Sequence, residues 1–258
     1  MKLETRNLKL ETRNLKLGSA QWKNIIRDGA GVVPGSQFMI SDSQAEQFAV
    51  HATELLRWNQ KINLTAIKDP FEIAVKHYID SLAPAPAVPA GASLLDIGSG
   101  GGFPGIPLKI LMPSLSVTLI DSSRKKINFQ KHVIRILGLK KIDAVHIRAE
   151  ELAGEEAFAN AFDIVVCRAF SSLDSFISLA LPLVAEQGTI IALKGKTAEA
   201  ETGSACSRSS EVFRTSDSSE IKGKDDLSLV LKKYTLPYLE ARRTMVLIQR
   251  NSGKISFI

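Results

Sequence analysis

A glycine-rich turn behind a short apolar segment constrains this chain more than any other feature. The segment Leu94–Ile97 contains the acid Asp96, and four glycines then fall within residues 98–102. This order predicts a buried strand that passes through a tight loop into a helix. Glycine permits positive φ and brings main-chain N–H groups close to a ligand, and the start of the helix adds unpaired donors. We therefore expect a small polar molecule to lie across this turn, held by main-chain amides.

Two kinds of ligand compete for such a turn. The segment Gly100–Gly105 fits the dinucleotide pattern G-x-G-x-x-G, but any glycine-rich run meets that pattern easily. The dinucleotide pattern also places its first glycine at the strand end and a pyrophosphate on the helix. Here Asp96 and Gly98 come first, and a carboxylate repels a pyrophosphate but attracts an ammonium group. The sequence favours S-adenosylmethionine over a dinucleotide as the cofactor.

Length and composition bound the class of protein. A chain of 258 residues can bury a substantial core, and its 45% hydrophobic content is ordinary for a globular protein. No apolar run reaches the ~18 residues of a membrane span, and the charged N-terminus does not resemble a signal peptide. The two cysteines, Cys167 and Cys206, form neither a disulfide framework nor a metal-binding spacing. We expect a cytoplasmic protein without a metal ion.

The N-terminal segment 1–19 contains a direct repeat. Residues 2–8 and 9–15 both read Lys-Leu-Glu-Thr-Arg-Asn-Leu, which we interpret as an expression scar outside the fold. Five basic and two acidic residues in this segment account for three of the six net positive charges of the chain. The mildly basic remainder permits a nucleic-acid partner but does not require one.

Residues 20–90 have a helical pattern. The segment Ser41–Ser43 predicts an N-cap before an apolar stripe that includes Phe48 and Leu55. Pro70 predicts the first turn of a further helix. Three prolines within residues 84–89 predict a stiff linker. We expect 20–90 to form a helical region in front of a second region, 91–258.

Strands and helices alternate after residue 91, which predicts a mostly parallel sheet covered by helices on both faces. The short connection between the final two strands favours an antiparallel pair. The serine-rich stretch 197–226 is interpreted as a frayed helix and a surface loop. The fold class is α/β, a Rossmann-like seven-stranded sheet with an antiparallel last strand and an N-terminal helical extension. The expected strands are 94–97, 117–120, 144–147, 162–167, 189–193, 227–236 and 244–250, and the later helices are 123–137 and 174–183.

Residues at the carboxyl ends of the parallel strands form the candidate site, because ligands of such sheets bind there. Asp121 follows Gly98 by 23 residues, which suits an acid that binds a ribose, although it also fits a cap for the next helix. Ala149 and Glu150 end the third strand, where an adenine would lie, although Glu150 also fits a solvated helix start. Arg168 ends the fourth strand and needs an anionic partner there.

Several other residues have plain structural explanations. Cys167 lies in an apolar strand and is interpreted as a core thiol rather than a nucleophile. Phe103 fits contact with an adenosine and burial in the core equally well. The polar cluster 59–65 and His77 fit capping and packing better than chemistry. Lys194 is a lysine at a strand end that fits either a phosphate contact or no specific role.

Five motifs in a fixed order resemble one known family. The chain resembles the RsmG (GidB) family of bacterial small-subunit ribosomal RNA methyltransferases from about residue 21 to the C-terminus, most weakly over 197–226. The Gly-Phe-Pro-Gly-Ile-Pro end of the loop is specific to this family, whereas Asp-x-Gly is shared by most class I methyltransferases. The motifs are Trp58-Asn59-Gln60-Lys61-Ile62-Asn63-Leu64-Thr65, His77-Tyr78-Ile79-Asp80-Ser81-Leu82, Asp96-Ile97-Gly98-Ser99-Gly100-Gly101-Gly102-Phe103-Pro104-Gly105-Ile106-Pro107, Arg168-Ala169-Phe170 and Leu193-Lys194-Gly195.

The resemblance implies the class I S-adenosylmethionine-dependent methyltransferase fold. It also implies methylation of N7 of a guanine at the 527 position of 16S ribosomal RNA. Because that nitrogen has a free lone pair and no hydrogen, we expect no catalytic acid or base. The resemblance implies donor contacts at Gly98, Phe103, Ala149, Glu150 and Arg168, and the pattern of strand ends and glycines adds Asp96, Gly100 and Asp121.

The expected partner is 16S ribosomal RNA or the small ribosomal subunit, with no membrane, and the protein is expected to act as a monomer. Phe170 is expected to stack on the target base. Two other functions stay open: a methyltransferase for a protein or small molecule, and a nucleotide-binding oxidoreductase. Methylation assays on ribosomal subunits, rRNA and protein would distinguish the first alternative from the rRNA methyltransferase. Titration with NAD and with S-adenosylhomocysteine would distinguish the second. The expected substrate contacts are Asn59, Lys61, Asn63, Phe170 and Lys194.

Overall fold

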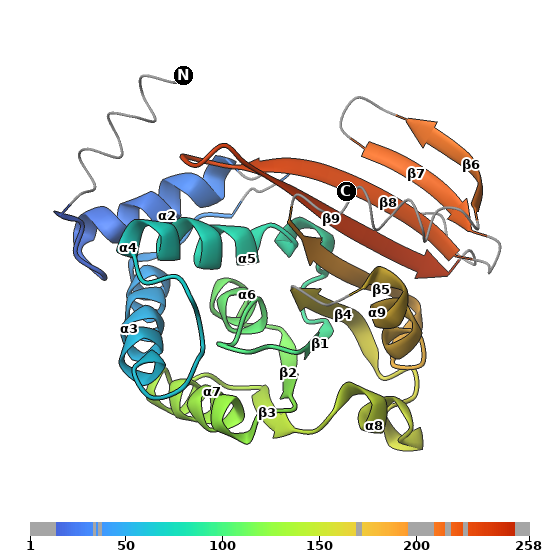
Figure 1. The fold of residues 1–258 in the computed structure, drawn as a ribbon, viewed down its shortest axis with the longest axis horizontal. Coiled ribbons are helices and arrows are strands. Elements are labelled where there is room, and N and C mark those ends of the chain that lie inside the picture. Colours follow the sequence, from blue (N-terminus) through green and yellow to red (C-terminus); the bar gives the residue numbers. More distant parts are fainter. Residues whose placement is uncertain are drawn as a thin grey trace.

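A mixed β-sheet with helices on both faces forms the centre of the computed structural model (Figure 1). The structure describes residues 14–32, 35, 38–168, 172–195, 209–214, 218–223 and 227–250. Within these residues, nine strands pair in the order β3-β2-β1-β4-β5-β9-β8-β7-β6. Strands β1 to β5 are parallel, and β9, β8, β7 and β6 continue the sheet in antiparallel pairs. The α/β class with a parallel centre is confirmed.

The strands expected from the sequence lie close to their predicted positions, and the last two form the antiparallel pair that was predicted. The nine strands are β1 (Ser93–Ile97), β2 (Ser116–Asp121), β3 (Ile142–His146), β4 (Phe162–Arg168), β5 (Val184–Lys194), β6 (Ser209–Arg214), β7 (Ser218–Gly223), β8 (Leu227–Leu236) and β9 (Ala241–Arg250).

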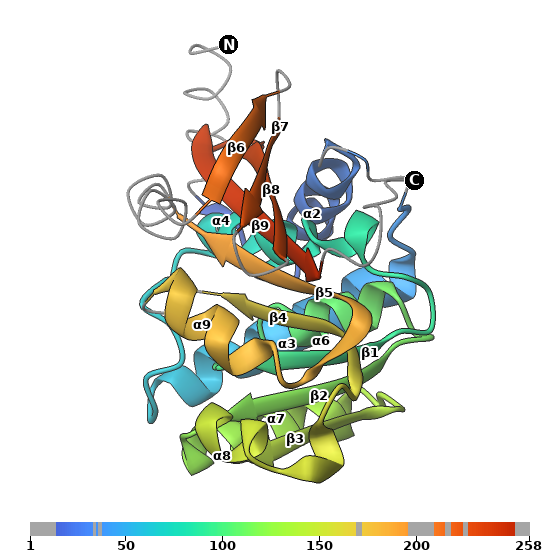
Figure 2. The ribbon, with the colours of Figure 1, turned by 90° about the vertical axis from the view of Figure 1, so that its right-hand side faces the viewer.

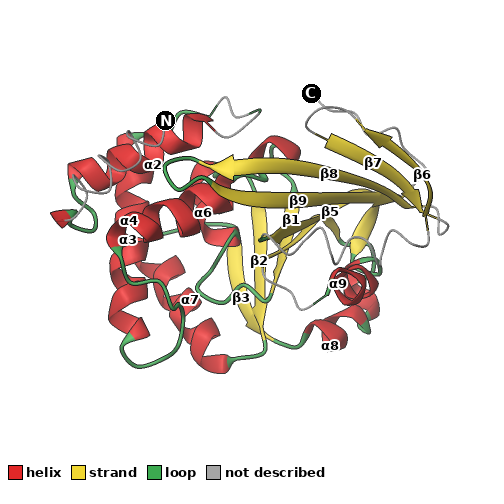
Figure 3. Ribbon diagram, turned by 45° about the horizontal axis from the view of Figure 1, so that its top comes forward, coloured by secondary structure: helices red, strands yellow, loops and turns green. Residues whose placement is uncertain are grey.

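The helices differ more in length than in position from those expected. Figure 3 shows them around the sheet. They are α2 (Ala20–Val32), α3 (Asp42–Asn59), α4 (Pro70–Ile73), the π-helix η2 (Ala74–Ile79), α5 (Asp80–Leu82), the 3-10 helix η3 (Ala85–Ala87), α6 (Gly105–Leu111), α7 (Arg124–Ile136), α8 (Ala149–Ala153), the 3-10 helix η4 (Glu156–Phe158) and α9 (Leu173–Ala180). No helix in the described part of the chain is both long and apolar enough to cross a membrane.

Two predictions about the second half of the sheet were wrong. The stretch 197–226 contributes strands β6 and β7, which extend the sheet from seven strands to nine. Its polar composition hid them, because an antiparallel hairpin on the edge of β8 needs main-chain pairing more than apolar side chains. In addition, β5 begins at Val184 rather than at 189, since α9 ends at Ala180 before Pro182.

The sheet separates two hydrophobic layers. Side chains of neighbouring residues on β4 alternate, so that Ile164 and Val166 belong to one core cluster and Val165 and Cys167 to the other. The first cluster contains residues of α3, α6 and α7, and the second contains residues of α8 and α9. Figure 2 shows α9 beside β4, with α3 and α6 on the other side of the sheet. Cys167 is 1% exposed, as expected for a core thiol.

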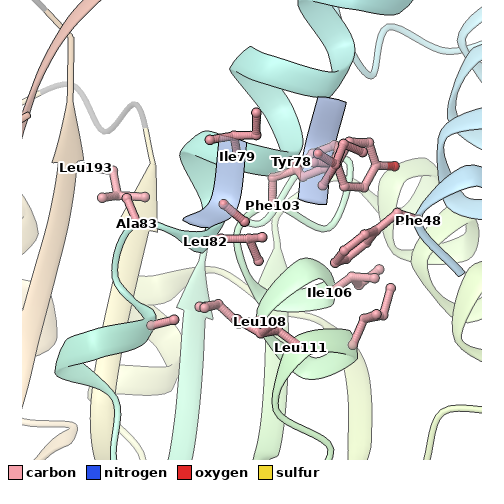
Figure 4. Packing of buried hydrophobic residues seen from close by; sticks show 14 of the residues in the cluster. Phe48, Tyr78, Ile79, Leu82, Ala83, Phe103, Ile106, Leu108, Leu111 and Leu193 are labelled. Atoms are coloured by element: carbon pink, nitrogen blue, oxygen red, sulfur yellow. The ribbon is translucent and has the colours of Figure 1, made fainter. Parts of the chain in front are cut away.

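The N-terminal helices share the first of these layers. Ser41 caps α3 through a capping box with Gln44, and Pro70 occupies the first turn of α4, as predicted. Buried residues of α5 lie against α6, as Figure 4 shows for Leu82 and Leu108, and those of η2 belong to the same core cluster. Leu15, from the segment interpreted as a scar, is also buried in this cluster.

A buried polar cluster joins the N-terminal helices to strands β8 and β9 of the sheet. Asp80 of α5 accepts a hydrogen bond from the Tyr234 hydroxyl of β8 at 2.8 Å. The other oxygen of its carboxylate lies 3.3 Å from Nε of Arg243 on β9. Asp80 is 5% exposed, so each partner removes part of the cost of burying its charge.

We predict that Tyr234→Phe destabilises the fold by leaving one oxygen of Asp80 without its donor. The expected loss in the free energy of unfolding is about 1–3 kcal/mol, the cost of an unsatisfied buried acceptor. Denaturant unfolding measures it. Tyr238→Phe is the control, because the half-buried Tyr238 ring contacts Phe71 and its change is expected to cost less than about 0.5 kcal/mol. Equal losses in the two variants would contradict the role of the Asp80 cluster.

Candidate functional site

The glycine loop between β1 and α6 has the predicted backbone but uses most of its amides internally. Gly98 and Gly102 have φ of 71° and 84°, which favour glycine. The N–H groups of Gly98 and Ser99 donate to Ile120 O, at 2.9 and 3.0 Å, and that of Gly102 donates to Ser99 O at 2.7 Å. The expectation that bare loop amides hold the ligand is therefore wrong for these residues. The loop instead offers space, since nothing lies within 4 Å of a Cβ built on Gly98.

Asp96 holds the start of α6. Its Oδ2 accepts the N–H of Gly105 at 2.8 Å, so a carboxylate already occupies the helix end where a pyrophosphate would lie. Its Oδ1 is buried and has no hydrogen-bond partner in the structure. Burial raises the pKa of Asp96 from 3.8 to about 7, against the lowering effects of the Gly105 N–H and Arg168. This arrangement disfavours a dinucleotide and leaves one acceptor for a cationic group.

Asp121 at the end of β2 fixes the other side of the loop. Its Oδ2 accepts the N–H of Gly100 at 3.0 Å, and its Oδ1 accepts the N–H of Ser123 at 2.8 Å. Lys126 lies 3.6 Å from the same Oδ2. Asp121 therefore binds the residue before α7, and among the described residues no side chain caps the first turn of that helix. Each carboxylate oxygen of Asp121 has a second lone pair, so acceptors are left for two hydroxyl groups.

A cavity of about 180 Å³ lies beside this carboxylate. It brings together four predicted donor residues, namely Gly98, Asp121, Ala149 and Glu150. The last two lie in the first turn of α8, which follows β3, and not at the strand end itself. Ser122 and Arg148 also line the cavity, and sequence reasoning missed them. The only signal for either was its place next to a predicted residue. The size of the cavity and its acidic and cationic side chains suit part of a polar nucleoside rather than an apolar ligand.

Arg168 at the end of β4 forms a second centre with η2. Its Nη2 donates to Nδ1 of His77 at 2.9 Å and its Nη1 to Lys76 O at 3.1 Å. Its guanidinium carbon lies 5.0 Å from the centre of the Phe103 ring, a cation–π contact. Burial lowers the pKa of Arg168, while Asp80 and Asp96 raise it through their charges. Among the described residues, no carboxylate lies within ion-pair distance of Arg168.

Phe103 stacks with two histidine rings, one of which sequence reasoning did not single out. The ring of His77 stacks on it at 4.7 Å between centroids, and that of His51 at 5.0 Å. His51 donates from Nε2 to Gly101 O at 2.9 Å, and burial lowers the pKa of His51 to about 4. Phe103 is 4% exposed and thus belongs to the core. A histidine on the apolar face of α3 was the available signal for His51.

The predicted substrate residues that the structure describes come from the 59–65 loop and from the end of β5. Asn59 closes its own loop, because Oδ1 accepts the N–H groups of Leu64 and Thr65 and Nδ2 donates to Thr65 O. Lys61 and Asn63 are exposed in that loop. Lys194 is buried at the end of β5. Phe170 lies outside the described residues. No group of three or more His, Cys, Asp or Glu side chains in the described chain could hold a metal ion.

The described site thus has two parts at the carboxyl ends of the parallel strands. One is the cavity beside Asp121, and the other is the cation at position 168 held by η2. Asp96 and the glycine loop lie between the strands that carry them, β2 and β4, on the central strand β1. This arrangement suits a ligand with a nucleoside at one end and a charged group at the other.

Comparison with known proteins identifies the family. Residues 44–226 match the family described as rRNA small subunit methyltransferase G. A protein of Geobacter sp. (strain M21) called ribosomal RNA small subunit methyltransferase G is 42% identical over 229 residues, which cover 89% of this chain and 98% of that protein. One of the same name from Geobacter sulfurreducens is 41% identical over 207 residues, 80% of this chain and 89% of that protein.

A solved structure supports the same fold at lower identity. A SAM-dependent methyltransferase from Aquifex aeolicus superposes with a TM-score of 0.51 at 13% identity, over 76% of this chain and 97% of that one. This likeness confirms the Rossmann-like methyltransferase fold. The sequence matches identify the family within that fold. The chain belongs to the rRNA small subunit methyltransferase G (GidB) family.

Proposed function

We propose that this protein transfers the methyl group of S-adenosylmethionine to N7 of a guanine, at the 527 position of 16S ribosomal RNA. Family membership makes it an rRNA methyltransferase that uses S-adenosylmethionine. The observation that supports this site is that a cavity beside Asp121, which suits part of a nucleoside, occurs together with the unpartnered Oδ1 of Asp96 and the guanidinium of Arg168. The atom and position methylated rest on the resemblance of the motifs.

The residues present fit S-adenosylmethionine at both ends. Asp121 would accept from the ribose hydroxyls, and the cavity formed with Ala149 and Glu150 would hold the adenine. Oδ1 of Asp96 would accept from the ammonium group and so gain the partner that it lacks. Arg168 has N–H donors beyond the two that bind η2, and these would bind the carboxylate. The open space at Gly98 lets the nucleoside approach the backbone.

Positioning is the chemical contribution of the protein. The bound cofactor supplies an electrophilic methyl group, and guanine N7 supplies a lone pair without loss of a proton. No residue therefore has to remove a proton. Burial lowers the pKa of His51 to about 4 and that of His77 to about 3, which also makes both rings weak bases. Alignment of two reactants in one site can lower a barrier by roughly 7–11 kcal/mol. Phe170, Lys61 and Asn63 remain the proposed contacts to RNA.

We predict that Asp121→Ala weakens the binding of S-adenosylhomocysteine by roughly tenfold or more, because two charge-assisted hydrogen bonds to the ribose are lost. Isothermal titration measures the dissociation constant. Asp143→Ala is the matched control, since that acid ends no strand and is exposed on β3. An affinity within about twofold of the wild type for Asp121→Ala would contradict the proposed ribose contact.

The raised pKa of Asp96 predicts that the free energy of unfolding depends on pH. Its pKa is about 7 in the fold and ordinary in the unfolded chain, so the folded state binds the proton more tightly. Its contribution to stability therefore falls as pH rises from about 4 to about 7 and stays low above that. Asp96→Asn cannot ionise, so its stability relative to the wild type should rise between pH 5 and pH 8 by an amount on the order of 2–3 kcal/mol.

Denaturant unfolding without ligand at both pH values tests this, and the same variant should bind S-adenosylhomocysteine more weakly because it carries no charge for the ammonium group. A relative stability that does not change with pH would contradict the buried, protonated carboxyl. Unchanged ligand affinity would contradict the ammonium contact.

The function itself is tested with small ribosomal subunits that lack the modification. Incubation with the purified protein and a labelled donor should place the label on one guanine of 16S ribosomal RNA, in a form that chemical cleavage specific for N7-methylguanine detects. Free 16S ribosomal RNA and lysate protein are the parallel substrates. Label on protein alone, or on an atom other than N7, would overturn the proposal.

A further inference from the structure

We propose that His77 is a positioning residue which holds Arg168 in place for the donor without itself neutralising the charge. This inference rests on the proposed function, because it assigns the Arg168 charge to the carboxylate of S-adenosylmethionine. The observation behind it is that the two groups which bind the guanidinium within the described residues, Nδ1 of His77 and the carbonyl oxygen of Lys76, are neutral acceptors.

The hydrogen bonds fix the state of the His77 ring. A guanidinium can only donate, so Nδ1 of His77, at 2.9 Å from Nη2 of Arg168, carries no hydrogen. The neutral ring must then carry its hydrogen on Nε2, which donates to Oγ1 of Thr65 at 2.8 Å. Burial, and next the charge of Arg168, lower the pKa of His77 to about 3, so the ring is neutral at physiological pH. One tautomer satisfies both partners.

Neutral acceptors can orient Arg168 without neutralising its charge, which a carboxylate could not do. An aspartate or glutamate at this place would hold Arg168 more strongly, but it would neutralise the charge that the ligand needs. The nearby Asp80 acts on Arg168 through its charge but makes no hydrogen bond to it, since its hydrogen-bond partners are Tyr234 and Arg243. Within the described part of the chain, Arg168 is therefore oriented without a carboxylate in direct contact, and the carboxylate of the donor can take that place.

The ring of His77 is fixed on several sides. It stacks on Phe103 at an interplanar angle of 15°, and Phe103 belongs to the glycine loop. Thr65, which receives its Nε2 hydrogen, also accepts the N–H of Ile67 at 2.9 Å. The π-helical turn η2 places Lys76 O and the His77 ring on the same guanidinium, and π-helical turns often occur at functional sites. The 59–65 loop, through Thr65, thereby acts on the donor site without touching the donor.

Three substitutions at one position separate the acceptor, the ring and the charge. His77→Phe keeps an aromatic ring against Phe103 but removes the acceptor. His77→Asn loses the ring but keeps a neutral acceptor near the position of Nδ1. His77→Asp keeps an acceptor and adds a negative charge. Each is titrated with S-adenosylhomocysteine and with 5′-methylthioadenosine, which has the same nucleoside but no amino-acid carboxylate.

The ratio of the two affinities is the readout. For His77→Phe we expect binding of S-adenosylhomocysteine to weaken roughly tenfold, while binding of methylthioadenosine stays within about twofold of the wild type. His77→Asn should keep both affinities within about threefold. His77→Asp should lose S-adenosylhomocysteine affinity at least as strongly as His77→Phe, because its charge competes with the ligand. A general disturbance of the fold would weaken the binding of both ligands and leave the ratio of their affinities unchanged.

A double substitution tests whether His77 acts through Arg168. In a protein that carries Arg168→Leu, adding His77→Phe should change the S-adenosylhomocysteine affinity by less than about twofold, because the residue that His77 positions is gone. Full additivity of the two losses would overturn the inference. So would an unchanged affinity ratio in His77→Phe, or His77→Asp binding S-adenosylhomocysteine as well as His77→Asn.

The result also separates this inference from the proposed function. If the wild type binds both ligands and Asp121→Ala weakens both, the nucleoside site stands, and a flat His77 series rejects only the positioning role. If the wild type binds neither ligand, the proposed use of S-adenosylmethionine fails, and the inference about His77 fails with it.

Discussion

Two buried carboxylates at the ends of neighbouring strands hold the glycine loop, and the rest of the site depends on them. Asp96 accepts the N–H of Gly105 and Asp121 accepts that of Gly100, so each fixes one end of the same loop. The loop amides are thereby used within the protein. The glycine loop provides a backbone without side chains, next to the carboxylates of Asp96 and Asp121, which have spare lone pairs. This arrangement suits a cationic nucleoside and not a pyrophosphate.

The N-terminal helices are part of the site rather than an addition to it. His51 of α3 binds the carbonyl of Gly101, and His77 of η2 binds Arg168 and stacks on Phe103. Asp80, three residues after His77, ties the same turn to β8 and β9. These contacts explain why the helices share one core with the sheet. A change in the 59–65 loop, through Thr65, can reach the donor site along this path.

The central sheet and half of the site could be predicted from the sequence, because strand ends and glycines are local signals. Gly98, Asp121, Ala149 and Glu150 meet at one cavity as expected. The roles of His51 and His77 could not be predicted, since each depends on contacts with residues at least 50 positions away. Strands β6 and β7 were missed for a similar reason, because the pairing of β6 with β7 and of β7 with β8 leaves little periodic signal in a polar segment.

A crystal structure of the complex with S-adenosylhomocysteine tests the central claim most directly. The account predicts the ribose hydroxyls on the carboxylate of Asp121, the amino group at Oδ1 of Asp96, and the ligand carboxylate on Arg168 with the His77 contact intact. An amino-acid end bound away from Arg168, or a nucleoside outside the cavity beside Asp121, would contradict it.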